Sequence, residues 1–202
     1  DKERIVRHYL LINDMVTTIP LDVRAISMTK LLETTFAAAY ENSIAGADPL
    51  AENRTLLQTL AIYVNNEDIA KLIGADAASD LPLARFIEVR LFRRQDLAQH
   101  VASVAAITAS LGPELAALLS TAKETYDARY RSGFSFSDLT ANSVGVALAS
   151  RAMQDRNSAI EMQKRLSELR TESDFMPEVG NNRDGLSEST FNAVYADSSS
   201  TE

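Results

Sequence analysis

Apolar residues recur at spacings of three and four along most of this chain, and this pattern restricts it to helices packed on helices. Near the start, Ile5, Tyr9, Ile12 and Val16 fall on one stripe at these spacings, as in an amphipathic helix. Trp is absent and aromatic residues make up 6% of the chain, so the core must come from Leu, Ile, Val, Met and Ala. Such a mixture suits close helix packing. The sequence therefore predicts a mainly α fold, a single helical-bundle-like domain.

Breakers and caps divide this pattern into successive helices. We expect helices over about 2–16, 22–40, 50–64, 96–111, 113–130 and 136–153, the last continuing with a bend to about 169. Residues 69–73 form a short apolar run, and residues 75–83 have the composition of a loop. Residues 86–91 alternate partly at period two, which predicts one short strand or hairpin near 85–92, for which no partner strand is evident.

The composition changes near residue 171. We assign residues 1–170 to a helical domain and expect residues 171–202 to be a loosely attached or partly disordered C-terminal tail. This tail is poor in apolar residues, contains a Gly-Asn-Asn turn at 180–182 and ends in a serine-rich stretch. The side chains able to anchor it to the body are Phe175, Met176, Leu186, Phe191 and Tyr195.

Charge and composition argue against several classes of protein. The chain has 20 basic and 28 acidic residues, a net charge of -8, which repels phosphate backbones, so we expect no nucleic-acid partner. The short basic run of Arg90, Arg93 and Arg94 is interpreted as structural or solvated. Cysteine is absent, which removes disulfides and thiolate chemistry. No apolar run approaches the roughly 20 residues needed to cross a bilayer, so the domain itself is not expected to span a membrane.

Two segments place polar residues on otherwise apolar helices. Asp96 and His100 are four residues apart and share a helix face, where apolar neighbours leave little room for water. Glu124 and Asp127 are three apart, follow Lys123 and also share a face. Carboxylate and imidazole groups in this pattern suit either acid–base work or a divalent metal ion.

A third polar segment begins the next helix. Ser135 stands three residues ahead of Asp138, an arrangement like a capping box, worth about 1 kcal/mol whatever else it does. Asn142 lies four residues after Asp138, on the same face. Gly145 follows one turn later, where the missing side chain permits close approach of another helix.

If these three helices pack together, one imidazole, several carboxylates and an amide converge. Leaving such groups buried and unpaired costs several kcal/mol each, so they must bond one another, hold a metal ion or line a wet cleft. The candidate catalytic residues are His100, Glu124, Asp127 and Asp138. The candidate binding residues are Asp96, Lys123, Ser135 and Asn142.

Each of these residues also has a purely structural interpretation. His100 can be a satisfied core histidine, Asp138 is fully explained by the helix cap and dipole, and Asn142 can be a packing amide. His8 has no polar company in the sequence and is interpreted as an ordinary surface or packing residue. The common catalytic and phosphate-binding motifs are missing, and two histidines cannot build a three-histidine zinc site in one chain.

The three polar segments, Asp96-x-x-x-His100, Lys123-Glu124-x-x-Asp127 and residues 133–145 with the letters GFSFSDLTANSVG, resemble a group of uncharacterised proteobacterial envelope proteins. More distantly they resemble the VanZ-like family and related periplasmic lipoproteins. Residues 48–54 and 174–177 are also similar to the uncharacterised group. The resemblance implies a location in the periplasm or at the outer face of the inner membrane, with a signal peptide or membrane anchor upstream of Asp1. The chain departs from the VanZ-like pattern in lacking several membrane helices.

Two functions remain open at this point. The first is a periplasmic domain that is structural or binds a protein partner in the envelope, with a buried polar cluster. The second is a hydrolase-like enzyme that uses His100, Glu124, Asp127 and Asp138, with or without a divalent metal. A weaker third alternative is a small-ligand binding domain that uses the same cleft.

Overall fold

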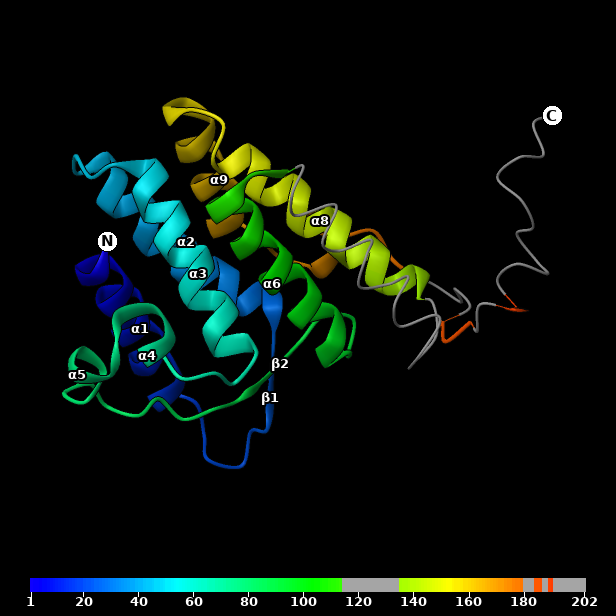
Figure 1. Ribbon diagram of the computed structural model, residues 1–202, viewed down its shortest axis with the longest axis horizontal. Coiled ribbons are helices and arrows are strands. Elements are labelled where there is room, and N and C mark those ends of the chain that lie inside the picture. Colours follow the sequence, from blue (N-terminus) through cyan, green and yellow to red (C-terminus); the bar gives the residue numbers. More distant parts are fainter. Residues whose placement is uncertain (114–134, 180–183, 187–188, 191–202) are drawn as a thin grey trace.

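The computed structural model describes residues 1–113, 135–179, 184–186 and 189–190 (Figure 1). It is mainly α, with one small parallel sheet among the described residues, which confirms the predicted fold class. The longer helices are α1 (Lys2–Thr17), α2 (Met28–Ile44), α3 (Pro49–Val64), α6 (Gln95–Leu111), α8 (Phe136–Ala152) and α9 (Arg156–Ser167). The short elements are β1 (Ala25–Ser27), α4 (Ala70–Ile73), α5 (Ala75–Ala78), β2 (Glu88–Arg90) and a 3-10 turn, Glu172–Asp174.

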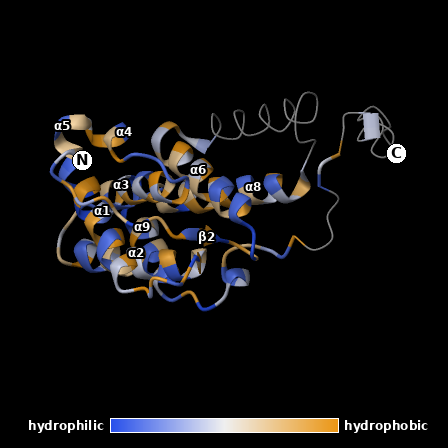
Figure 2. Ribbon diagram, turned by 90° about the horizontal axis from the view of Figure 1, so that it is seen from below, coloured by the Kyte–Doolittle hydropathy of each residue, from blue (hydrophilic) through white to orange (hydrophobic). Residues whose placement is uncertain are grey.

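Helix α6 is the central contact of the bundle. It packs along α8 on one side and along α3 on another, while α2 packs along α9 and α1 lies against α3 (Figure 1). Hydrophobic and hydrophilic colours alternate along these helices in Figure 2, as expected when each helix turns one stripe inward. The core is made mainly of aliphatic residues and contains few aromatic ones. Its most buried side chains include Leu31, Leu32, Phe36, Leu56, Leu60 and Leu97.

The predicted strand near 85–92 is confirmed, and the structure supplies its partner. Strand β2 pairs in parallel with β1, with Ile26 opposite Val89. The prediction of a helix from residue 22 is therefore wrong at its start, because residues 25–27 are extended and form backbone hydrogen bonds with β2. Helix α2 begins only at Met28, where the Ser27 hydroxyl accepts from the Lys30 N–H at 3.2 Å. Periodicity along one segment cannot reveal a pairing with a distant strand.

Two further boundaries differ from expectation. The segment expected as a loop at 75–83 contains the single helical turn α5. The helix expected to bend through residue 160 instead stops at Ala152, and α9 starts anew after Asp155, whose carboxylate accepts from the Ser158 N–H at 2.9 Å. The Asp155 cap starts a new helix three residues after α8 ends, so α8 and α9 are two helices instead of one bent helix.

Gly145 brings α8 into backbone contact with α6. A Cβ built on it would lie 2.7 Å from the Val101 carbonyl oxygen and 3.1 Å from the Ala105 nitrogen. Real Cβ atoms do not approach a carbonyl so closely, so any larger residue would force the helices apart. The expected close approach of another helix at Gly145 is confirmed.

Two tyrosines tie the connection before β2 to the helices. Tyr9 on α1 donates to the Pro82 carbonyl and accepts from the Ala84 N–H, both at 3.0 Å. Tyr63 on α3 donates to the Arg85 carbonyl and accepts from the Ile87 N–H, both at 3.1 Å. Burial raises the pKa of Tyr63, so the hydroxyl keeps its proton and can serve as donor and acceptor at once.

The described residues 171–179 and 184–186, called the C-terminal segment below, contact the helical body. Met176 and Leu186, two of the expected anchors, are buried, and Phe175 packs against the core. The other two expected anchors, Phe191 and Tyr195, lie outside the described residues. Within the described parts of the chain, no helix combines the length and apolar character that a membrane span requires.

Candidate functional site

His100 lies between two polar side chains of α8. Its Nδ1 is 2.8 Å from Oδ1 of Asn142, and its Nε2 is 3.3 Å from Oδ2 of Asp138. The side chains of His100 and Asp138 are 15% and 17% exposed, so both are largely screened from water. The structure thus confirms that the segments starting at Asp96 and at Ser135 converge. A doubly protonated imidazole would donate to both oxygens, and its exchangeable protons could serve acid–base chemistry.

The start of α8 fixes Asp138. Ser135 is the N-cap, and its hydroxyl accepts from the Asp138 N–H at 3.0 Å. This confirms the predicted cap and holds the first turn in place. The cap explains the position of Asp138 but leaves its carboxylate free to face α6, where it meets His100 and Arg94.

Arg94, just before α6, gathers three carboxylates. Its guanidinium contacts Asp96 at 2.6 Å, Asp184 at 2.7 Å and Asp138 at 3.6 Å. The hydrogen bonds that Arg94 donates to Asp96 in particular raise the pKa of Arg94, with a further contribution from the bond to Asp184. Partial burial by itself would raise the pKa of Asp96, but its hydrogen bonds with Arg94 outweigh burial and hold that pKa below the usual value. Sequence reasoning interpreted Arg94 as structural or solvated and gave it no partner.

Asp184 comes from the C-terminal segment and sits at the N-terminal end of α8. Its Oδ1 accepts from the Ser135 hydroxyl at 2.9 Å and from the Ser137 N–H at 3.2 Å. Burial opposes the charge, but the hydrogen bonds from Arg94, Ser137 and Ser135 lower the pKa of Asp184 overall. A carboxylate at a helix N-terminus is stabilised by the free N–H groups and the helix dipole. No spacing in the sequence links Asp184 to α8, so it was missed.

We call the polar residues joined in this way the polar cluster. Its members are Arg94, Asp96, His100, Ser135, Asp138, Asn142 and Asp184. Three of the predicted site residues, Lys123, Glu124 and Asp127, lie outside the described residues. Among the residues that are described, no group of three or more His, Cys, Asp or Glu side chains could hold a metal ion.

A second polar centre surrounds Glu52, which is fully buried on α3. Its carboxylate pairs with Arg7, with Arg4 at 3.3 Å and with the amide of Asn42 at 3.1 Å. His8 is 1% exposed, and its Nε2 lies 3.5 Å from Oε2 of Glu52. Sequence reasoning found no partner for His8. The spacing of Arg4, Arg7 and His8 on one helix face was the available signal, and only the position of α3 shows what they face.

The pKa of His8 is lowered to about 4. Burial is the main cause, and the positive charges of Arg7 and Arg4 add to it, while a hydrogen bond with the backbone of Glu52 opposes the change. Burial and the neighbouring guanidinium charges both disfavour the imidazolium, so they favour the neutral imidazole of His8.

A buried amide pair joins three helices near the same core. Asn53 on α3 donates to the Ala152 carbonyl at the end of α8, at 2.8 Å, and accepts from Nε2 of Gln163 on α9, also at 2.8 Å. Both side chains are fully buried. This pair satisfies a carbonyl that the end of α8 would otherwise leave without a partner.

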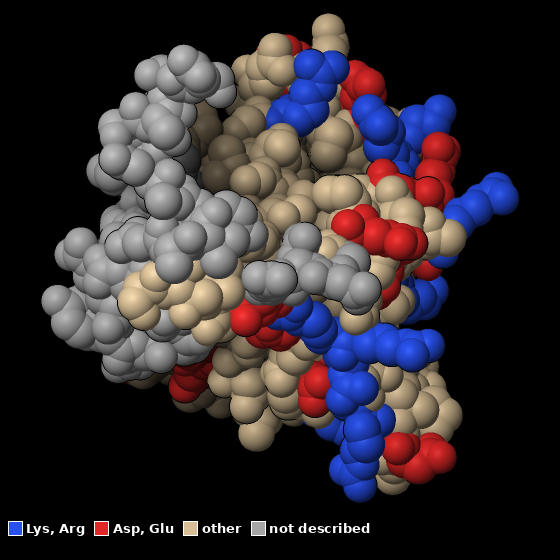
Figure 3. All heavy atoms as spheres, turned by 90° about the vertical axis from the view of Figure 1, so that its right-hand side faces the viewer, with Lys and Arg blue, Asp and Glu red and all other residues tan. Residues whose placement is uncertain are grey.

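Comparison with known proteins finds no matching family model, no matching curated protein and no matching solved structure. The functional interpretation therefore depends on the geometry of the two polar centres and on the surface around them. On the face in Figure 3, Lys and Arg side chains are interspersed with Asp and Glu.

Proposed function

We propose that this chain is a structural, partner-binding domain of the cell envelope, in which the polar cluster fastens the C-terminal segment to the helical body. The observation that supports this most is the pairing of Arg94 with carboxylates from the start of α6, the first turn of α8 and the C-terminal segment. The carboxylate oxygens of Asp184 accept hydrogen bonds from Arg94, the Ser135 hydroxyl and the Ser137 N–H. Groups that bond one another in this way hold the C-terminal segment against the helical body, and we call these bonds of Arg94 and Asp184 the fastening.

The energetics favour a fastening made of several bonds. Arg94 is 35% exposed, so each ion pair is screened by water and contributes at most about 1 kcal/mol. Asp184 combines such a pair with two hydrogen bonds at a helix N-terminus, where the dipole adds a few tenths of a kcal/mol or more. The C-terminal segment also buries Met176 and Val179. Together these contacts oppose the loss of conformational entropy that accompanies ordering of the segment.

The fastening would present a fixed surface to a partner. Within the C-terminal segment, Pro177 and Glu178 are exposed while Met176 and Val179 are buried. A protein partner that reads exposed residues of this segment would find them already held in place, which lowers the entropic cost of association. The location in the envelope rests on the resemblance of residues 96–145 to envelope proteins, and fractionation of cells that express the full-length gene product tests it.

Site-specific photo-cross-linking in the native cell tests the proposal. A photoreactive amino acid at Glu178 should give a discrete adduct that is weakened when Asp184→Asn is added, because the fastening is lost. The matched control places the same group at Arg156, an exposed residue of α9. Absence of an adduct at 178, or the same adducts at both positions, would count against partner binding by the C-terminal segment.

A second function, acid–base or metal-assisted hydrolysis, is favoured by one observation. Asp138 Oδ1 and Asn142 Nδ2 are buried and make no hydrogen bond among the described residues, next to the imidazole of His100. The Asn142 amide nitrogen suits donation to a bound substrate, and the Asp138 oxygen suits acceptance from a substrate or a divalent metal held together with the predicted residues Glu124 and Asp127. Metal content of the purified protein and titration with Mn²⁺ or Zn²⁺ test this alternative. Binding that disappears in Asp138→Asn would support it, and no binding would leave the fastening as the account of the cluster.

A further inference from the structure

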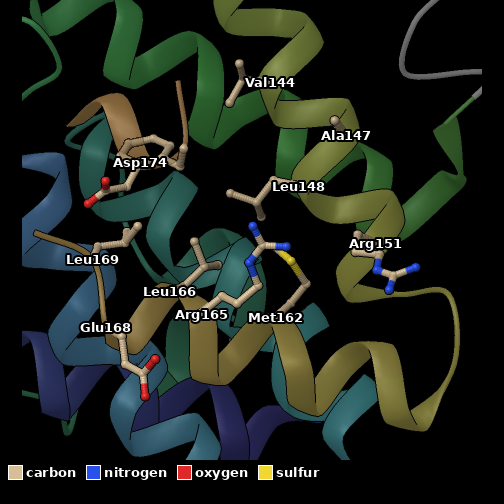
Figure 4. Close-up of a pocket in the computed structure, with 11 residues that line it drawn as sticks. Val144, Ala147, Leu148, Arg151, Met162, Arg165, Leu166, Glu168, Leu169 and Asp174 are labelled. Carbon is tan, nitrogen blue, oxygen red and sulfur yellow. The ribbon is translucent and has the colours of Figure 1, made fainter. Parts of the chain in front are cut away.

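A cleft lies between α8, α9 and the chain that follows α9. It encloses about 550 Å³, within the size range of small-molecule sites. Figure 4 shows its walls. The apolar lining includes Val144, Leu148, Met162, Leu166, Leu169 and Phe175. None of the polar-cluster residues lines it, so it is a separate feature of the molecule.

Arg165, an exposed residue of α9, supplies a positive charge at the edge of this cleft. In Figure 4 its guanidinium extends from α9 over the cleft toward Leu148 and Met162. No described carboxylate lies within ion-pair distance of it, whereas Arg151 at the other side of the cleft pairs with Glu161 at 3.1 Å. Arg165 is therefore the cation that remains available to a ligand.

The two acidic residues at the cleft do not cancel this charge. Glu168 points away from Arg165 in Figure 4. Asp174 is committed to the backbone, because its Oδ2 accepts from the N–H groups of Arg170 and Thr171, both at 2.8 Å. These bonds lower the pKa of Asp174 and orient its carboxylate toward the main chain.

We propose that this cleft binds a free fatty acid, with the acyl chain on Leu148, Leu166 and Phe175 and the carboxylate on Arg165. Charge complementarity selects an anion, and the apolar lining selects a chain of methylenes. An arginine recognises a carboxylate through paired N–H donors. Each methylene that enters the cleft should tighten binding by up to about fourfold until the cleft is filled. The proposal goes beyond the partner-binding function and does not depend on the fastening.

Isothermal titration of the full chain with octanoate and dodecanoate, below their micelle concentrations, tests this. We expect saturable 1:1 binding that is tighter for dodecanoate, and at least tenfold weaker binding of dodecanol, which lacks the charge. Arg165→Gln should weaken dodecanoate binding about tenfold. The matched control is Lys164→Gln, which removes an exposed charge from the neighbouring position without touching the cleft and should leave the affinity unchanged.

Several results would overturn the proposal. No dodecanoate binding by the wild-type chain, or equal affinity in Arg165→Gln, removes the assigned role of the cleft and of Arg165. Binding of dodecanol as tight as dodecanoate would show a site without charge selection. A parallel arm with phosphatidylglycerol vesicles separates the sources of the ligand, since capture by vesicles without binding of free dodecanoate would indicate a membrane surface instead.

Discussion

Nδ1 of His100 lies 2.8 Å from Oδ1 of Asn142, so α6 and α8 are joined by a polar contact between their inner faces. Less than one helical turn further along α8, Gly145 lets the two backbones touch at Val101. The His100–Asn142 contact and the close backbone approach at Gly145 therefore fix the same helix pair. The first turn of α8 is held in addition by Arg94 and Asp184.

Gly145→Ala should destabilise the protein by about 1–3 kcal/mol, because the new methyl group would lie 2.7 Å from the Val101 carbonyl oxygen. Helix propensity acts in the opposite direction, since alanine is favoured over glycine by about 1 kcal/mol inside a helix. Urea unfolding measures the net change. Ser143→Ala on the exposed face of α8 is the control, and a more stable Gly145→Ala variant would disprove the close contact.

Glu52→Gln should lower the free energy of unfolding by about 2–3 kcal/mol. The substitution keeps the shape of the side chain but removes the charge that Arg4 and Arg7 share. The cost stays below that of a fully buried pair because both arginines reach water. Glu33→Gln, which breaks an exposed pair with Lys30, should change stability by less than about 0.5 kcal/mol. Similar effects from the two variants would contradict the buried centre.

His8 should make the protein less stable as the pH falls from 6.5 toward 4. Its pKa is about 4 in the folded chain against 6.5 for an ordinary histidine, so protons bind the unfolded chain preferentially in this window. The free energy of unfolding is not reduced by His8 above about pH 6.5. Below about pH 4 the reduction is complete and amounts to about 3 kcal/mol. Chemical unfolding at a series of pH values should show this slope in the wild type.

His8→Gln isolates the contribution of His8 to that slope from those of the other titrating groups. The variant should be less stable at neutral pH, since a buried side chain is replaced, but its stability should depend less on pH between 5 and 6.5 than that of the wild type. Equal slopes in the two proteins would show that the pKa of His8 is not lowered in the folded state.

Asn53→Ala should destabilise the chain by about 2–4 kcal/mol. It leaves the Ala152 carbonyl and the Gln163 amide buried without their partner and opens a small void. Thermal unfolding gives the comparison with Asn157→Ala, an exposed site at the start of α9, for which a change within about 0.5 kcal/mol is expected. A small effect at Asn53 would mean that the amide pair is dispensable.

Local rules served well where contacts are local. The capping pattern at Ser135 correctly predicted the start of α8, and Gly145 correctly predicted a close helix neighbour. The four-residue spacing placed Asp138 and Asn142 on one face of α8, where both contact His100. Contacts between distant segments were missed. Nothing in the spacing around Asp184 pointed to Arg94, and strand β1 was interpreted as helix because its partner lies far along the chain. Buried charge at Glu52 was missed for the same reason, since its partners Arg4 and Arg7 lie on another helix.

Hydrogen–deuterium exchange of wild type and Asp184→Asn tests the fastening most directly, with Asp80→Asn as an exposed control. We expect amides at Ser137 and in the C-terminal segment to exchange at least about fivefold faster in Asp184→Asn, corresponding to about 1 kcal/mol of lost local stability. Amides of α3 should be unchanged, and Asp80→Asn should match the wild type. Unaltered exchange at Ser137 and in the C-terminal segment would contradict the fastening.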